Sequence, residues 1–188
     1  MCGKVAVSLL MIAGVGGCKT GASLPNEPGQ GLDLIANPTF ESHGSPSLAG
    51  WITTDSAVVQ FSASLPPGGS GWTILLRNRL GPAPVGLYNS VYTTIMPPIG
   101  TYACRLSLFG RKEGEAGGVV ALYVHRFQNG GTDLLGTLSI NNTNWMLCAT
   151  IDTLNARPGD TVVVLISGGS GEYSGSTYVN TCKFEKLQ

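Results

Sequence analysis

The chain has 188 residues, of which 43% are hydrophobic and 12% charged, with 11 basic (Lys+Arg) and 11 acidic (Asp+Glu) side chains. This length and apolar content allow one domain with a sizeable core. The low charged fraction argues against a disordered, highly charged chain, and the lack of any basic excess argues against nucleic acid as a partner. The 27 glycines and 11 prolines predict many turns.

The first seventeen residues have the pattern of an export signal. Lys4 gives a positive start, and the apolar run Val5–Val15 is shorter than the about 20 residues that span a bilayer. The run ends in Gly16-Gly17-Cys18 and resembles a bacterial lipoprotein signal. That resemblance implies a lipid on Cys18 and an anchor on the extracytoplasmic side of the bacterial cell envelope. The alternatives are a buried apolar segment or a secretory signal cut elsewhere.

The composition of residues 18–31 predicts a flexible tether, because the segment holds three glycines and two prolines and Leu24 is its one large apolar residue. From Leu32 to the C-terminus, short apolar runs are separated by Gly and Pro clusters, with no amphipathic helix pattern. Residues 32–188 are therefore expected to form one all-β domain, either a sandwich or a barrel. The expected strands are Val58–Phe61, Thr73–Leu76, Ser90–Ile95, Tyr102–Phe109, Val119–Phe127, Leu135–Ile140, Trp145–Ile151, Thr161–Ser167 and Tyr178–Leu187.

Alternation along a strand predicts which side chains face the core. Tyr102, Cys104, Leu106 and Leu108 form the apolar face of their strand. In the last strand the inward set is expected to be Tyr178, Asn180, Cys182 and Phe184. In the strand before Thr161–Ser167 it is expected to be Trp145, Leu147, Ala149 and Ile151, so that Cys148 faces outward.

Several segments, in order, resemble the galactose-binding-like jelly rolls, a group that includes many carbohydrate-binding modules. The segments are Asn37-Pro38-Thr39-Phe40-Glu41 with Gly50-Trp51, then Ser90–Ile95, Gly100–Ser107, Trp145-Met146-Leu147 and Tyr178–Phe184. The resemblance implies a two-sheet antiparallel β-sandwich of jelly-roll type over Leu34–Leu187. It does not by itself define a function, since this fold hosts sugar binders, protein binders and structural modules.

Catalysis is not expected from these residues. The two histidines, His43 and His125, fall on a loop and on a strand face, and no nucleophile elbow, metalloprotease motif or phosphate loop is present. Glu113 and Glu115 lie two residues apart in a Gly-rich segment, which is more typical of a solvated hairpin tip than of an acid–base pair.

Aromatic side chains are the best ligand candidates, because a sugar ring stacks its C–H face on a flat side chain. Alternation places Tyr92 opposite a core set, and Tyr123 and His125 opposite Leu122 and Val124. If these strands share a sheet, as the jelly-roll resemblance implies, the three side chains lie on one exposed surface. Trp72 and Tyr88 are loop candidates. Scattered surface aromatics with no ligand are the alternative.

The resemblance also implies a possible structural calcium ion, with Glu41 and Asn180 at the ligand positions. Asn180 stands where the family usually has Asp, which keeps an oxygen but loses a charge. Ordinary structural roles for Glu41 remain the alternative.

Cys104 and Cys182 point inward by alternation, and the family topology implies that their strands are neighbours in one sheet. This suggests a Cys104–Cys182 disulfide that leaves Cys148 unpaired, in an exported domain. Three reduced cysteines packed as small apolar residues are the alternative.

Two functions follow as expectations. The first is a non-catalytic carbohydrate-binding surface lipoprotein domain, whose partners are a polysaccharide or glycan and, through its lipid, a membrane. The second is a structural or protein-interaction lipoprotein with the same sandwich and no sugar site.

Overall fold

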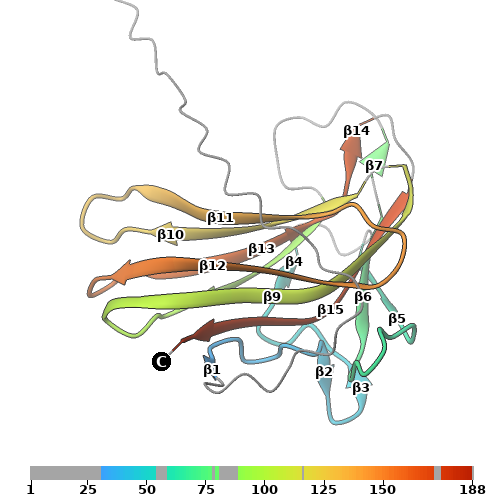
Figure 1. The fold of residues 1–188 in the computed structure, drawn as a ribbon, viewed down its shortest axis with the longest axis horizontal. Helices are drawn as coiled ribbons and strands as arrows, with labels where there is room; N and C mark the ends of the chain where they lie inside the picture. The colour runs from blue at the N-terminus through green and yellow to red at the C-terminus, as the bar shows by residue number, and fades with distance from the viewer. Residues whose placement is uncertain are drawn as a thin grey trace, which may run out of the picture.

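The computed structural model describes residues 31–53, 59–77, 79–80, 89–115, 117–171 and 175–187. The expected signal, Cys18 and Tyr88 lie outside this set. Within it there is no helix, and two antiparallel sheets stack face to face as the two layers of Figure 1. The expected all-β, two-sheet jelly-roll sandwich is confirmed. No helix among these residues has the length and apolar character needed to cross a membrane.

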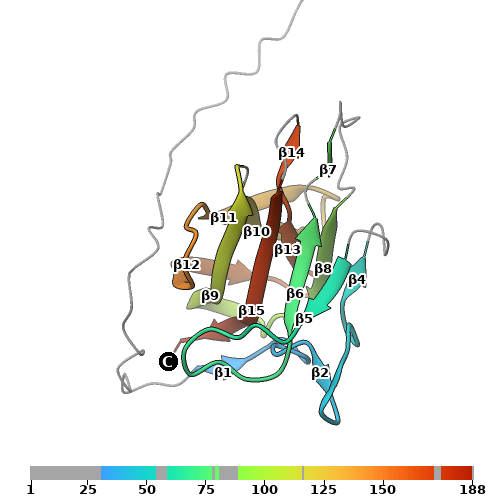
Figure 2. The same cartoon turned by 90° about the vertical axis from the view of Figure 1, so that its right-hand side faces the viewer.

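The six-stranded sheet runs in the order β12–β9–β15–β6–β5, with β1 paired to β15. Figure 2 shows β9, β15, β6 and β5 side by side at the front of the molecule. Its strands are β1 (Leu32–Asp33), β5 (Val59–Ser62), β6 (Thr73–Arg77), β9 (Gly100–Gly114), β12 (Met146–Ala156) and β15 (Gly175–Lys186).

The five-stranded sheet runs in the order β11–β10–β13–β8–β4. Its strands are β4 (Ile52–Thr53), β8 (Ser90–Ile95), β10 (Gly118–His125), β11 (Thr132–Ile140) and β13 (Thr161–Ser167). Two small ribbons complete the fold: β2 (Glu41–Ser42) with β3 (Ser45–Pro46), and β7 (Arg79–Leu80) with β14 (Ser170–Gly171).

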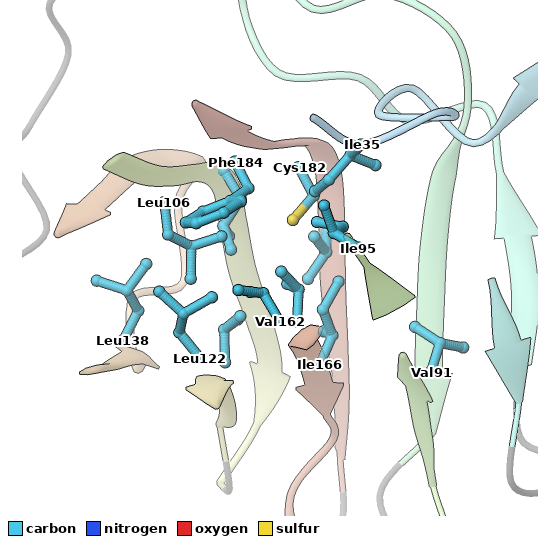
Figure 3. Close-up of a cluster of buried hydrophobic side chains, with 14 of the residues drawn as sticks. Ile35, Val91, Ile95, Leu106, Leu122, Leu138, Val162, Ile166, Cys182 and Phe184 are labelled. Atoms are coloured by element: carbon cyan, nitrogen blue, oxygen red, sulfur yellow. The ribbon is translucent and has the colours of Figure 1, made fainter. Parts of the chain in front are cut away.

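The core lies between the two sheets and comes from the inward positions of alternating strands (Figure 3). Leu106 and Phe184 from the six-stranded sheet face Leu122, Leu138 and Val162 from the five-stranded sheet, each less than 2% exposed. The β-branched and leucine-rich runs form strands here because each can bury one face while its other face stays polar or half-exposed.

Strand β12 presents the opposite face from the one expected. Cys148 and Leu154 are fully buried, whereas Ile151 is 64% exposed. The pairing with β9 explains this reversal, because Cys148 lies opposite the buried Leu108 and therefore shares its inward face. The predicted inward set of Trp145, Leu147, Ala149 and Ile151 is wrong.

Strand β15 changes faces at a β-bulge. Asn180 lies opposite Phe109, and Lys183 lies opposite Ser107. Between these two pairs β15 advances by three residues and β9 by only two, which defines the bulge. Thr181 has a φ of 49° at this point. Before the bulge Val179 points into the core, and after it Cys182 and Phe184 do. Tyr178, expected to be inward, is therefore on the outer face.

The cysteine pairing is also wrong. Strands β9 and β15 are neighbours as expected, but Cys104 lies opposite Lys186, four residues beyond Cys182. At about 3.3 Å per residue this offset separates the two by roughly 13 Å along the strands, more than the about 7 Å a disulfide allows. Both are free, buried thiols, and burial raises the pKa of Cys104 to about 11. Cys148, expected to be exposed and unpaired, is buried and disulfide-bonded.

Candidate functional site

The candidate ligand surface is the outer face of the five-stranded sheet. Tyr92 projects from β8 because its neighbours Val91 and Thr93 are buried. Tyr123 projects from β10 because Leu122 and Val124 are buried. The sequence-based prediction that Tyr92, Tyr123 and His125 occupy one face of one sheet is thus consistent with the topology.

Strand β13 lies between the two tyrosines and supplies the surface that joins them. Leu165, opposite Tyr92, is only 6% exposed, whereas Val163, opposite both Thr94 and Tyr123, is half-exposed. Tyr92 and Tyr123 are two strands and two residues apart, which corresponds to about 12 Å between their backbones. The face therefore carries two half-buried aromatic rings on either side of a short aliphatic strip.

A row of polar side chains borders Tyr123. His125 pairs with Thr161 on one side and with Thr132 on the other. Its Nδ1 is hydrogen-bonded to the Thr132 hydroxyl at 2.7 Å. This row offers an imidazole and hydroxyl groups next to an aromatic ring, which is the combination that holds a hydroxyl-rich ligand.

An ion-pair network holds the loops at this end of the sheet. Arg126 contacts Asp133 at 2.7 Å and Asp160 at 2.8 Å. Burial acts to raise the pKa of Asp160, but hydrogen bonds from Arg126 and from the Arg157 and Phe127 amides outweigh it and hold that pKa below its usual value. The carboxylate therefore stays charged and fixes the loops next to His125.

Trp72 lies apart from this surface. Its indole nitrogen donates to the Gly44 carbonyl at 3.3 Å, and its backbone nitrogen donates to the Thr39 carbonyl at 2.9 Å. It thus packs against the N-terminal segment beside the six-stranded sheet. The structure does not bring Trp72 together with Tyr92 and Tyr123.

The residues at the expected calcium positions do not fit that ion. Asn180 is fully buried, and its amide nitrogen donates to the Ser70 and Trp72 carbonyls, both at 3.1 Å. Glu41 accepts a hydrogen bond from the Gly44 amide at 3.0 Å. Calcium needs six to eight oxygens, whereas here an N–H group already faces the two carbonyls. Among the described residues, no group of three or more His, Cys, Asp or Glu side chains is placed to hold a metal.

Sequence reasoning missed the contribution of β13. Val162, Val164 and Ile166 are buried in the core, while Val163 is half-exposed on the outer face beside Leu165. An unbroken apolar run shows no alternation, so it does not reveal that one of its faces forms part of a surface. The position of this run between two strands that each carry an outward tyrosine would have been the only available signal.

Comparison with solved structures identifies the architecture. The chain is similar to a family 16 carbohydrate-binding module, with a TM-score of 0.57 and 17% identity over 81% of this chain and 99% of that one. It is also similar to TmCBM61, solved with β-1,4-galactotriose, with a TM-score of 0.52 and 16% identity over 82% and 99% of the two chains. The fold is that of the carbohydrate-binding modules.

A protein from Bacteroides thetaiotaomicron described as a putative sugar binding protein has the same fold. Its TM-score is 0.52, with 12% identity over 82% of this chain and all of that one. No family model matches the sequence, and no curated protein matches it. Because the identities are low, these likenesses establish the fold and leave the ligand to be argued from the site.

Proposed function

We propose that the protein is a non-catalytic carbohydrate-binding domain whose site is the outer face of the five-stranded sheet. The observation that carries the proposal is the placement of the half-buried Tyr92 and Tyr123 on one outer face with a polar row beside them. The structures of similar fold support it, since one of them was solved with a galactotriose.

The geometry favours an extended saccharide over a single sugar. Each tyrosine offers a flat surface for the C–H face of one ring. The two residues lie about 12 Å apart across strand β13, so one sugar cannot stack on both. His125, Thr132 and Thr161 then meet the hydroxyl groups of the unit nearest Tyr123.

The test is isothermal titration against a panel of neutral oligosaccharides that includes β-1,4-galactotriose. Tyr92→Ala and Tyr123→Ala should each weaken binding about tenfold, because each removes a stacking surface. Phe127→Ala is the control, since Phe127 is 76% exposed at a loop tip outside the face. Equal losses in all three variants would contradict the site.

A protein-interaction function is the second candidate, and one observation favours it. Met96, Ile99 and Phe127 are 82%, 68% and 76% exposed. They lie on the loops that follow β8 and β10, which end side by side on β13. If the folded protein binds none of the saccharides in the panel, that result would support this candidate over the first.

The cell-envelope location is part of the proposal and rests on the leader sequence. The charged start, the short apolar run and Gly16-Gly17-Cys18 support lipidation of Cys18 and an extracytoplasmic position. Replacing Cys18 with Ala should release the protein from the membrane fraction of a bacterial expression host. Mature protein that retains Met1, or recovery of native Cys18 in a disulfide-linked peptide, would contradict the anchor.

A further inference from the structure

A pocket lies on the outer face of the six-stranded sheet, on the other side of the molecule from Tyr92 and Tyr123. It has a volume of about 460 Å³, and strands β6, β15 and β9 supply its lining residues. These strands lie next to one another at the front of Figure 2. The lining residues are Leu75, Arg77, Glu113, Gly114, Gly175, Ser176 and Tyr178.

The strand register explains why these side chains meet. Arg77, Ser176 and Glu113 are directly opposite one another across β6, β15 and β9. Leu75 and Tyr178 form part of the next row along the same face. Glycines 114 and 175 are opposite each other at the end of the sheet, where the lack of side chains leaves the pocket open.

Glu113 is held in a defined orientation at the edge of the pocket. One carboxylate oxygen accepts from Arg111 at 2.8 Å, and the other accepts from the Tyr178 hydroxyl at 2.7 Å. The hydrogen bonds from Tyr178 and Arg111 lower the pKa of Glu113. Each oxygen keeps a further lone pair that can accept a hydrogen bond from a ligand hydroxyl.

Arg111 is fixed by aromatic rings. Its guanidinium carbon lies 3.8 Å from the centre of the Tyr178 ring and 5.3 Å from that of Trp145. The two rings are themselves edge-on at 6.4 Å. A guanidinium held in this way keeps the lining residues Glu113 and Tyr178 in fixed positions, which lowers the entropy that a ligand must remove on binding.

Arg77 is the cation of the pocket lining. It is exposed, and it has no ion pair or side-chain hydrogen bond with the described residues. Glu113 is the other charged lining residue, and its carboxylate is already ion-paired with Arg111, which lies outside the lining. The pocket is therefore suited to an anion, and Arg77 is the group that remains available for a carboxylate.

We propose that this pocket is a second, independent saccharide site that binds a uronic acid unit, with Arg77 pairing the sugar carboxylate and Glu113 and Ser176 binding its hydroxyls. Only the choice of a saccharide as the ligand rests on the proposed function. The charge and geometry of the site do not depend on Tyr92 or Tyr123, because they belong to the other sheet.

The experiment titrates the full chain with trigalacturonate and with its methyl ester, which removes the charge alone. Trigalacturonate should bind at least about tenfold more tightly than the ester, with an affinity that falls as salt rises. Arg77→Ala should weaken trigalacturonate about tenfold and leave the ester unchanged. Arg157→Ala is the matched control, because Arg157 is also exposed but lies at the other end of the sandwich.

The outcomes separate this proposal from the proposed function. Equal binding of acid and ester, or an unchanged affinity of Arg77→Ala, would overturn the second site. If Tyr92→Ala no longer binds trigalacturonate while Arg77→Ala still does, this saccharide binds on the five-stranded sheet. That result also overturns the second site. If Arg77→Ala loses affinity for trigalacturonate and the wild-type protein binds no neutral saccharide, the second site is supported and the proposed function is contradicted.

Discussion

At the scale of single residues, Asn180 joins two segments of the chain through its side-chain amide. Its two N–H groups face the Ser70 and Trp72 carbonyls, and its oxygen accepts from the Thr181 hydroxyl at 2.6 Å. All of its polar atoms are thereby satisfied within a fully buried site. The connection between β15 and the 70–72 segment is therefore made by hydrogen bonds within the chain.

Changing Asn180 to Asp should make the stability of the domain dependent on calcium. Without the ion, a carboxylate would face two carbonyl oxygens with no donor between them, which should cost about 1–3 kcal/mol or more. With calcium the new carboxylate and the two carbonyls can become ligands, with water completing the coordination, so the melting temperature should recover. Thermal unfolding with EDTA, calcium and magnesium tests this. A wild-type protein that gains as much stability from calcium as the variant would contradict the interpretation of the amide.

At the scale of elements, β12 and β15 show how pairing decides which face of a strand is buried. In β12 the residues predicted to be inward are apolar, yet β9 requires Cys148 and Leu154 on the inside. In β15 one extra residue near Thr181 reverses the alternation. Both shifts move tyrosine or isoleucine side chains to the surface, and the shift in β15 places Tyr178 in the wall of the second pocket.

Two alanine substitutions within β12 test its corrected orientation. Leu154→Ala should destabilise the domain by about 2–5 kcal/mol, because it leaves a cavity in the core. Ile151→Ala should cost less than about 1 kcal/mol, because that side chain is already 64% exposed. Urea unfolding followed by tryptophan fluorescence measures both. A larger destabilisation by Ile151→Ala than by Leu154→Ala would contradict this orientation and support the one expected from the sequence.

At the scale of the whole molecule, the two sheets are joined at one end by Arg126. This residue follows β10 of the five-stranded sheet and donates at 2.7 Å to the carbonyl of Asn155, in β12 of the six-stranded sheet. It also pairs with Asp160, whose side chain is 1% exposed. Asp160 in turn accepts from the Phe127 and Arg157 amides. The network thus connects both layers beside the candidate ligand surface.

The stabilisation from Asp160 should disappear in acid. Because its pKa is lowered in the folded state, its contribution is present above the ordinary carboxyl pKa of about 3.9 and is lost as the pH falls through the lower folded value. Asp160→Asn should therefore lower the free energy of unfolding at pH 7 by about 1–3 kcal/mol. This difference should shrink as the pH is lowered toward 2.

Urea unfolding of both proteins at pH 7 and at acidic pH measures the effect. Asp133→Asn is the control, since Asp133 pairs with the same arginine but is 57% exposed and should contribute less than about 1 kcal/mol. A difference between wild type and Asp160→Asn that does not change with pH would rule out the charge as its source.

The sequence by itself determined the strand positions, the all-β class and the outward direction of Tyr92 and Tyr123. Each of these depends on alternation within one short segment, because side chains on a strand point to opposite faces in turn. The jelly-roll order of motifs added the expectation that these strands share a sheet, and the topology agrees.

Only the tertiary structure decided the buried face of β12, the bulge in β15 and the separation of Cys104 from Cys182. It also decided that Arg77, Ser176 and Glu113, far apart in the chain, stand in one row. The physical reason is that register is a property of two strands: a shift of one residue moves every side chain beyond it to the other face. No pattern within a single segment records such a shift.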